Sequence, residues 1–207
     1  MNALIDSRNI HTIKRDVAGV ALLIAVIWLV FALDYFLPLE QLGIVPRTLR
    51  GLIGIVAMPF LHGDFTHLLS NTVPLAVTML LLAGSRANSG IIVIFITILC
   101  GVGLWLFGRE ALHIGASGVV FGLIAFHVFA GIFERRLQSV IIAMIVGLSY
   151  ASTVLQGIMP FQRGVSWEGH LIGAVSGAIV ALLTARMLRD NNSLGNPSGN
   201  NTSREST

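Results

Sequence analysis

Six apolar segments that are almost free of charge constrain the fold of this chain more than any other feature. They cover residues 17–37, 65–83, 89–107, 115–133, 137–155 and 169–188. A helix needs about 20 mainly apolar residues to cross the hydrocarbon core of a bilayer. We therefore predict an all-α membrane protein, built as a bundle of six transmembrane helices.

The composition supports this class, since 55% of the 207 residues are hydrophobic and only 11% are charged. The length leaves no room for a sizeable soluble domain beside the bundle. We expect a cytoplasmic N-terminal segment at 1–16, a membrane domain at 17–189 and a disordered cytoplasmic tail at 190–207, which is rich in Asn and Ser. No clear cleavage signature follows Lys14 and Arg15, so we expect the first span to be retained.

Basic residues indicate the orientation. With six crossings, one side carries Arg8, Lys14, Arg15, Arg86, Arg135, Arg136, Arg186, Arg189 and Arg204, and the other carries Arg47, Arg50, Arg109 and Arg163. The richer side is expected to be cytoplasmic, together with both termini. The formal net charge of +3 therefore reflects topology, and we expect no nucleic-acid partner.

A shorter apolar segment at 51–61 lies between the first two spans. It is too short to cross a bilayer, so we predict that it re-enters the membrane or lies at the interface. Arg47 and Arg50 beside it are expected to reach the head groups by snorkelling.

A serine between glycines begins the fourth span, in the sequence Gly115-Ala116-Ser117-Gly118. Polar groups inside a membrane are costly, and they are either paired with a neighbouring helix or functional. The free N–H groups of a helix N-terminus suit a developing oxyanion. Because small residues in membrane helices more often serve packing, the motif alone favours packing over catalysis.

A partner for Ser117 begins the sixth span at His170. Each of these two spans carries glycines four residues apart, which are Gly118 and Gly122 on one span and Gly173 and Gly177 on the other. Such stripes permit close packing of helices. Packing through them would bring Ser117 near His170, where the imidazole can act as its base.

A second pair of polar residues begins the second span. His67 and Asn71 are related by i to i+4, so they share one face of a helix. Their N–H groups can stabilise negative charge on a carbonyl oxygen. The alternative is a pair that forms hydrogen bonds between helices, which is a common role for polar residues in membranes.

Within the spans, no carboxylate lies where it would orient His170, and Glu168 is expected to project to another face. We therefore predict a Ser-His dyad. Phe121, one turn after Ser117, is expected to stack on the imidazole. His62 and His113 lie in loops and are expected at the surface. A zinc site formed by His62, His67, His113 and His170 is disfavoured, because the sequence has no His-Glu-x-x-His motif and no thiolate cluster.

These motifs resemble the rhomboid family of intramembrane serine proteases over nearly the whole chain. The resemblance implies that Ser117 is the nucleophile and His170 the general base and acid. It further implies an oxyanion hole built from the Ser117 amide, His67 and Asn71, with no metal and no cofactor. The implied partners are transmembrane protein substrates and membrane lipid, with the site open to the outer face. The compact size and the absence of organelle targeting indicate a bacterial plasma membrane.

Two other function classes fit parts of the same pattern. A non-catalytic relative would bind transmembrane helices in the same groove without needing Ser117. A small transporter fits the hydropathy, but the chain has no convincing internal repeat. An aspartyl protease is poorly supported, because Asp34 is the only acidic residue within a predicted span.

Overall fold

The computed structural model describes residues 7–86, 88–160 and 164–194. Its elements, in order, are α1 (Ser7–Asp34), η1 (Leu39–Leu42), α2 (Gly51–Ala57), η2 (Met58–Phe60), α3 (Phe65–Ser85), α4 (Ser89–Phe107), α5 (Ser117–Glu134), α6 (Leu137–Gly157) and α7 (Trp167–Leu194). Within those ranges the only β structure is an isolated bridge between Ile44 and His113. The predicted all-helical class is confirmed.

Six helices are long and apolar enough to cross a membrane, namely α1, α3, α4, α5, α6 and α7, and they confirm the six predicted spans. The first helix ends at Asp34, earlier than predicted, because the chain approaches Pro38 and a residue before proline disfavours helical backbone. At the other end α7 continues to Leu194, so the first residues of the predicted tail are helical. Residues 1–6 and 195–207 lie outside the described ranges, as do Arg163 and Arg204.

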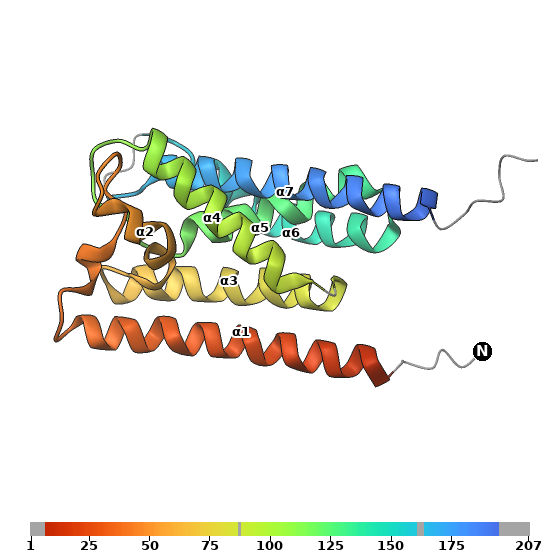
Figure 1. Cartoon of the computed structure of the whole chain (residues 1–207), viewed down its shortest axis with the longest axis horizontal. Helices are drawn as coiled ribbons and strands as arrows, with labels where there is room; N and C mark the ends of the chain where they lie inside the picture. The colour runs from red at the N-terminus through yellow and green to blue at the C-terminus, as the bar shows by residue number, and fades with distance from the viewer. Residues whose placement is uncertain (1–6, 87, 161–163, 195–207) are drawn as a thin grey trace, which may run out of the picture.

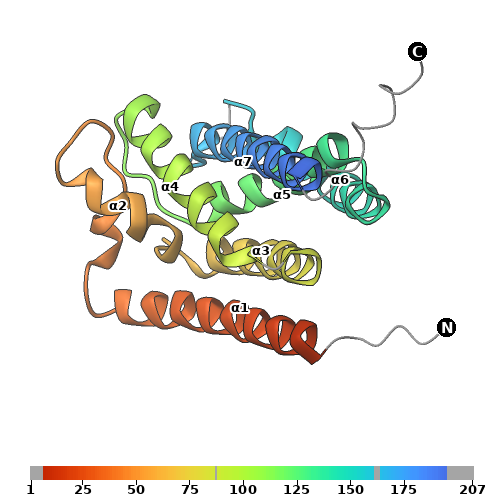
Figure 2. The same cartoon turned by 45° about the vertical axis from the view of Figure 1, so that its right-hand side comes forward.

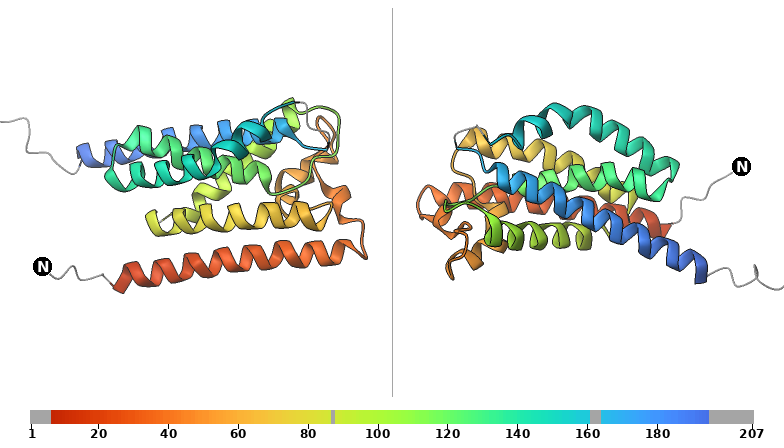
Figure 3. Two further views of the ribbon diagram at one scale, coloured as in Figure 1. Left: turned by 180° about the vertical axis from the view of Figure 1, so that it is seen from behind. Right: turned by 90° about the horizontal axis from the view of Figure 1, so that it is seen from above.

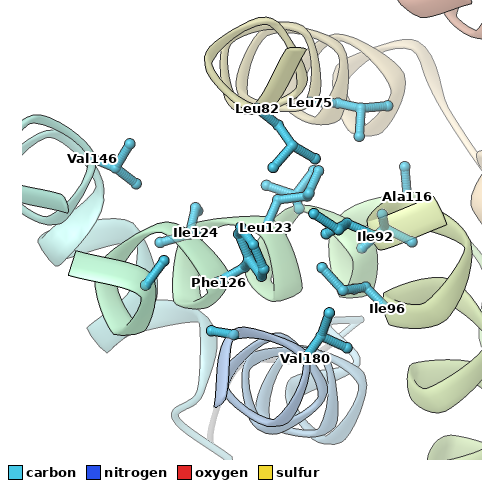
Figure 4. Packing of buried hydrophobic residues seen from close by; sticks show 14 of the residues in the cluster. Leu75, Leu82, Ile92, Ile96, Ala116, Leu123, Ile124, Phe126, Val146 and Val180 are labelled. Atoms are coloured by element: carbon cyan, nitrogen blue, oxygen red, sulfur yellow. The ribbon is translucent and has the colours of Figure 1, made fainter. Parts of the chain in front are cut away.

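The central element of the bundle is α5, which packs against α3, α4, α6 and α7 (Figures 1 and 2). A helix that is apolar on all sides is expected to be buried on all sides. Accordingly, Leu123 and Phe126 of α5 are fully buried, and Leu82 of α3, Ile96 of α4 and Val180 of α7 surround them (Figure 4). This core holds the N-terminus of α5 in place.

Glycine permits the close approach of α5 and α7. A Cβ on Gly173 would overlap the carbonyl of Gly118, and one on Gly177 would overlap the carbonyl of Gly122. The two stripes singled out in the sequence therefore face each other, and backbone lies directly against backbone. This contact fixes the depth of the first turn of α7 relative to the first turn of α5.

The bundle has two distinct ends. The first turn of α1 and the last turn of α7 lie at one end, at the right in Figure 1, and α2 lies at the other (Figures 1 and 3). Both arginines beside α2 bind carbonyls of this chain: Arg47 donates to Gly108 O at 2.8 Å, and Arg50 donates to Gln41 O at 2.6 Å. They therefore anchor the 43–50 loop to the protein.

Candidate active site

Side chains from four helices line one cavity of about 1080 Å³. Ser117 comes from α5, His170 from α7, and His67 and Asn71 from α3. The face of α6 that ends at Gly157 completes the wall. The cavity thus brings together the four residues to which the sequence assigns chemistry.

Ser117 is the first residue of α5 and follows a turn that only glycine accommodates easily. Gly115 has a φ of +111°, where a side chain is strained. A Cβ there would also lie 2.6 Å from Nε2 of His67, so the imidazole packs directly over the Gly115 backbone. The turn is pinned further by the Gly115 N–H, which donates to Met58 O at 3.0 Å.

The tautomer of His170 follows from its hydrogen bond. Its Nδ1 lies 2.8 Å from the carbonyl oxygen of Gly157. A carbonyl only accepts, so Nδ1 carries the proton and Nε2 holds a free lone pair. The Phe121 ring stacks on the imidazole, with centroids 4.1 Å apart, as its position one turn after Ser117 predicts. The His170 imidazole is therefore held by a hydrogen bond at its edge and by the Phe121 ring against its face.

The Ser117 and His170 side chains do not hydrogen bond to each other, and within the described part of the chain neither Ser117 Oγ nor His170 Nε2 has another partner. Catalytic hydrogen bonds in unliganded proteins are often long and tighten when substrate binds. The Gly118–Gly173 contact, one residue after Ser117, sets the approach of the two helices.

Local hydrogen bonds hold the first turns of α3, which carry the two donors. Asp64 caps the helix by accepting the His67 N–H at 2.8 Å. Asn71 donates one amide hydrogen to His67 O at 2.8 Å, which leaves its second hydrogen for a ligand. The His67 ring also contacts the edge of the His62 ring, with centroids 5.0 Å apart. Asn71 itself is buried.

The prediction that His62 and His113 lie at the surface is wrong, since each side chain is 2% exposed. His62 Nε2 accepts the N–H of Ala116 at 3.4 Å, directly before Ser117. His113 Nδ1 lies 2.7 Å from Ser166 Oγ. Burial lowers the pKa of His62 to about 4, with His67 contributing, and it also lowers the pKa of His113.

Sequence reasoning missed the Gly157 carbonyl as the partner of His170, because a backbone acceptor leaves no mark in the sequence. Glu168 does not take that place; its carboxylate lies 3.2 Å from the guanidinium of Arg109. A neutral carbonyl therefore stands where a carboxylate would complete a triad. Sequence reasoning also missed that His62 lies next to Ala116, directly before Ser117. The one feature that could have indicated this is the position of His62 five residues before His67, on the approach to α3.

Comparisons with known proteins agree with this architecture. Residues 49–187 match the family model described as the rhomboid domain. An uncharacterized protein of Mycobacterium tuberculosis is 38% identical over 192 residues, covering 84% of this chain and 79% of that protein. One of Mycobacterium leprae is 36% identical over 181 residues, covering 81% and 71%. A protein of Acanthamoeba polyphaga mimivirus, named as a rhomboid protein, is 28% identical over 166 residues, covering 76% and 88%.

The family model spans α2 to α7 and includes every residue that lines the cavity. The mycobacterial relatives extend the similarity over most of both chains. Six helices of membrane-spanning length agree with that assignment. The chain is an integral membrane protein and belongs to the rhomboid family.

Proposed function

We propose that this protein is an intramembrane serine endopeptidase that cleaves membrane-anchored proteins with a dyad of Ser117 and His170. One observation carries the proposal. The Nδ1–H of His170 donates to the Gly157 carbonyl, so Nε2 is left as a proton acceptor in the cavity that Ser117 shares. A serine hydroxyl becomes an effective nucleophile when such a base takes its proton.

The reaction proceeds in two halves. Ser117 Oγ attacks the scissile carbonyl while His170 Nε2 takes the hydroxyl proton, and His170 then gives that proton to the leaving amine. The acyl group stays on Ser117 until a water, deprotonated by His170, attacks the ester. Breakdown of the second tetrahedral intermediate releases the acid and returns the proton to Ser117.

Negative charge on the tetrahedral oxygen needs donors that are already in place. The Ser117 N–H lies at the first turn of α5, where helical N–H groups have no partner in the helix. The His67 ring and the second amide hydrogen of Asn71 come from α3 on the other side of the cavity. These three groups form the proposed oxyanion hole.

A neutral carbonyl is an adequate partner for His170 in this setting. It fixes the tautomer and the ring orientation, which are two of the tasks of the carboxylate in a triad. It also avoids placing a negative charge in a medium of low dielectric constant, where an unpaired charge is expensive. The stacked Phe121 ring supplies a second constraint on orientation.

The proposed setting is a bacterial plasma membrane, with both termini in the cytoplasm and the cavity open to the outer face. The distribution of Lys and Arg supports this orientation. The catalytic domain is 17–189, and its partners are transmembrane protein substrates and the surrounding lipid. The 51–61 segment is proposed to lie at the membrane interface or to re-enter the membrane.

Purified wild-type protein, Ser117→Ala and His170→Ala test the proposal with a membrane-anchored reporter and a fluorophosphonate probe. Wild type is expected to cut the reporter and to be labelled at Ser117, while both variants lose cleavage. The matched control is Ser176→Ala on α7, where the hydroxyl donates to Ile172 O of the same helix. Undiminished cleavage by Ser117→Ala would refute the proposal. Reporter binding by a wild type that never cleaves would instead favour a non-catalytic binding protein.

A further inference from the structure

His113 joins three segments of the chain at the end of the bundle that holds the cavity. It lies in the loop between α4 and α5, and its side chain is buried. Its backbone forms an antiparallel bridge with Ile44, with N···O distances of 2.8 and 2.9 Å. This bridge ties the loop before Ser117 to the segment before α2.

The His113 side chain has a defined tautomer. Its Nε2 lies 3.0 Å from the carbonyl oxygen of Arg109, which only accepts, so Nε2 carries the proton. Burial lowers the pKa of His113, which favours this neutral form. Nδ1 is then an acceptor, and Ser166 Oγ at 2.7 Å donates its hydrogen to it.

Ser166 in turn starts the helix that carries His170. It directly precedes α7, and its Oγ accepts the N–H of Gly169 at 3.3 Å, as a residue that caps a helix does. The Ser166 carbonyl accepts the N–H of His170 at 3.1 Å, which closes the first turn. The Ser166 hydroxyl therefore donates to the loop between α4 and α5 and accepts from the first turn of α7.

His113 lies four residues before Ser117, and Ser166 lies four residues before His170. We propose that the hydrogen bond between His113 and Ser166 holds the turn before Ser117 in register with the first turn of α7, and we call this hydrogen bond the tie. The inference rests on the proposed dyad and deepens it. Neither residue touches the reacting atoms, so both are positioning residues.

A second link between the same segments allows the tie to be tested without loss of the fold. Arg109 donates to Val165 O at 2.9 Å and lies 3.2 Å from the Glu168 carboxylate. The Gly118–Gly173 contact persists as well. Removing the tie should therefore loosen the relative position of the two turns while the helices stay packed.

Two matched pairs of variants isolate the tie. Ser166→Asn keeps a capping oxygen and an N–H donor, whereas Ser166→Ala keeps neither. His113→Asn places an acceptor near the position of Nδ1, whereas His113→Gln reaches only the position of Nε2. We expect Ser166→Ala and His113→Gln to lose about tenfold in kcat with KM nearly unchanged, because small misplacements of a base are costly. Ser166→Ala also loses the helix cap and should have a lower Tm, whereas His113→Gln keeps the cap and isolates the loss of the tie. The two Asn variants should retain most of the wild-type kcat.

Amide hydrogen exchange at Gly169 and His170 gives a readout that does not depend on activity. Exchange is expected to be faster in Ser166→Ala and His113→Gln than in wild type and in the Asn variants. Equal kcat and equal exchange across all four variants would overturn the tie. A wild type that fluorophosphonate never labels at Ser117 would refute the proposed protease instead, and the exchange data would then still decide whether the tie exists.

Discussion

The Phe121 ring lies parallel to the imidazole of His170, with 4.1 Å between centroids and 7° between planes. The C-terminal residue of α6 fits against the edge of both rings. A Cβ on Gly157 would overlap Phe121 Cζ and lie 2.9 Å from His170 Nδ1. Glycine at this position is what allows the Gly157 carbonyl to reach His170.

Gly157→Ala is therefore expected to displace both rings and to lower kcat by about 10- to 100-fold, the range expected when a catalytic group is misplaced. The measurement is the cleavage rate of a membrane-anchored reporter. The matched control on the same helix is Gly147→Ala, because a Cβ there meets only Val128 at an ordinary 3.7 Å. Similar rates for the two variants would show that His170 does not depend on the close approach of α6.

Gly177→Ala tests the contact between α5 and α7 away from the cavity. The new methyl would overlap the Gly122 carbonyl, and overpacking of a tight contact costs about 1–3 kcal/mol or more. We expect a lower Tm and reduced cleavage. Gly90→Ala on α4 is the control, since nothing lies within 4 Å of a Cβ there. A Tm for Gly177→Ala equal to that of Gly90→Ala would contradict the predicted clash.

The fold followed from the sequence because length and apolarity together decide which segments cross a membrane. The six spans needed no knowledge of tertiary contacts, and the glycine stripes indicated which two helices pack closely. Boundaries were less predictable, since the end of α1 depends on the turn that leads into Pro38, where Asp34 accepts the Glu40 N–H at 2.9 Å.

The site followed from the sequence only where side chains carry the chemistry. Ser117 and His170 were marked by their positions at the starts of two glycine-striped helices. The Gly157 carbonyl could not be identified in this way, because every residue has a backbone carbonyl. The burial of His62 and His113 depends on tertiary contacts, with Ala116 for His62 and with Ile44 and Ser166 for His113, which local sequence does not encode.

The pair formed by Arg86 and Glu134 provides a prediction at the opposite end of the bundle. The Arg86 guanidinium contacts both Glu134 carboxylate oxygens, at 2.5 and 2.6 Å, and the Glu134 side chain is only 2% exposed. Ser139 also donates to that carboxylate at 2.7 Å. Arg86→Met leaves the carboxylate without its cation and should cost about 3–5 kcal/mol of stability.

The double variant Arg86→Met/Glu134→Met should cost less than Arg86→Met alone, because no buried charge remains unpaired. Denaturation midpoints of the two single variants and the double variant measure this coupling. Arg15→Met, at a pair whose arginine side chain is 75% exposed, is the control and should cost at most about 1 kcal/mol. Additive losses in the double variant would mean that the two charges do not stabilise each other.

The stability of the fold in acid depends on His62. Burial, together with nearby His67, lowers the pKa of His62 from its ordinary value of 6.5 to about 4. The unfolded chain therefore takes up a proton near pH 6.5, while the folded protein holds His62 neutral down to about pH 4. Since the unfolded state binds more protons in this window, stability falls as the pH falls through it, by roughly 3 kcal/mol at most.

His62→Gln removes this titration while keeping an oxygen that can accept the Ala116 N–H. Its Tm is expected to fall less steeply than that of wild type between pH 6.5 and about 4, and to run parallel to it above that window. Some slope remains in the variant, because the pKa of buried His113 is also lowered. Curves that stay parallel across the whole range would show that His62 is protonated equally in the folded and unfolded states, and burial would then not lower its pKa.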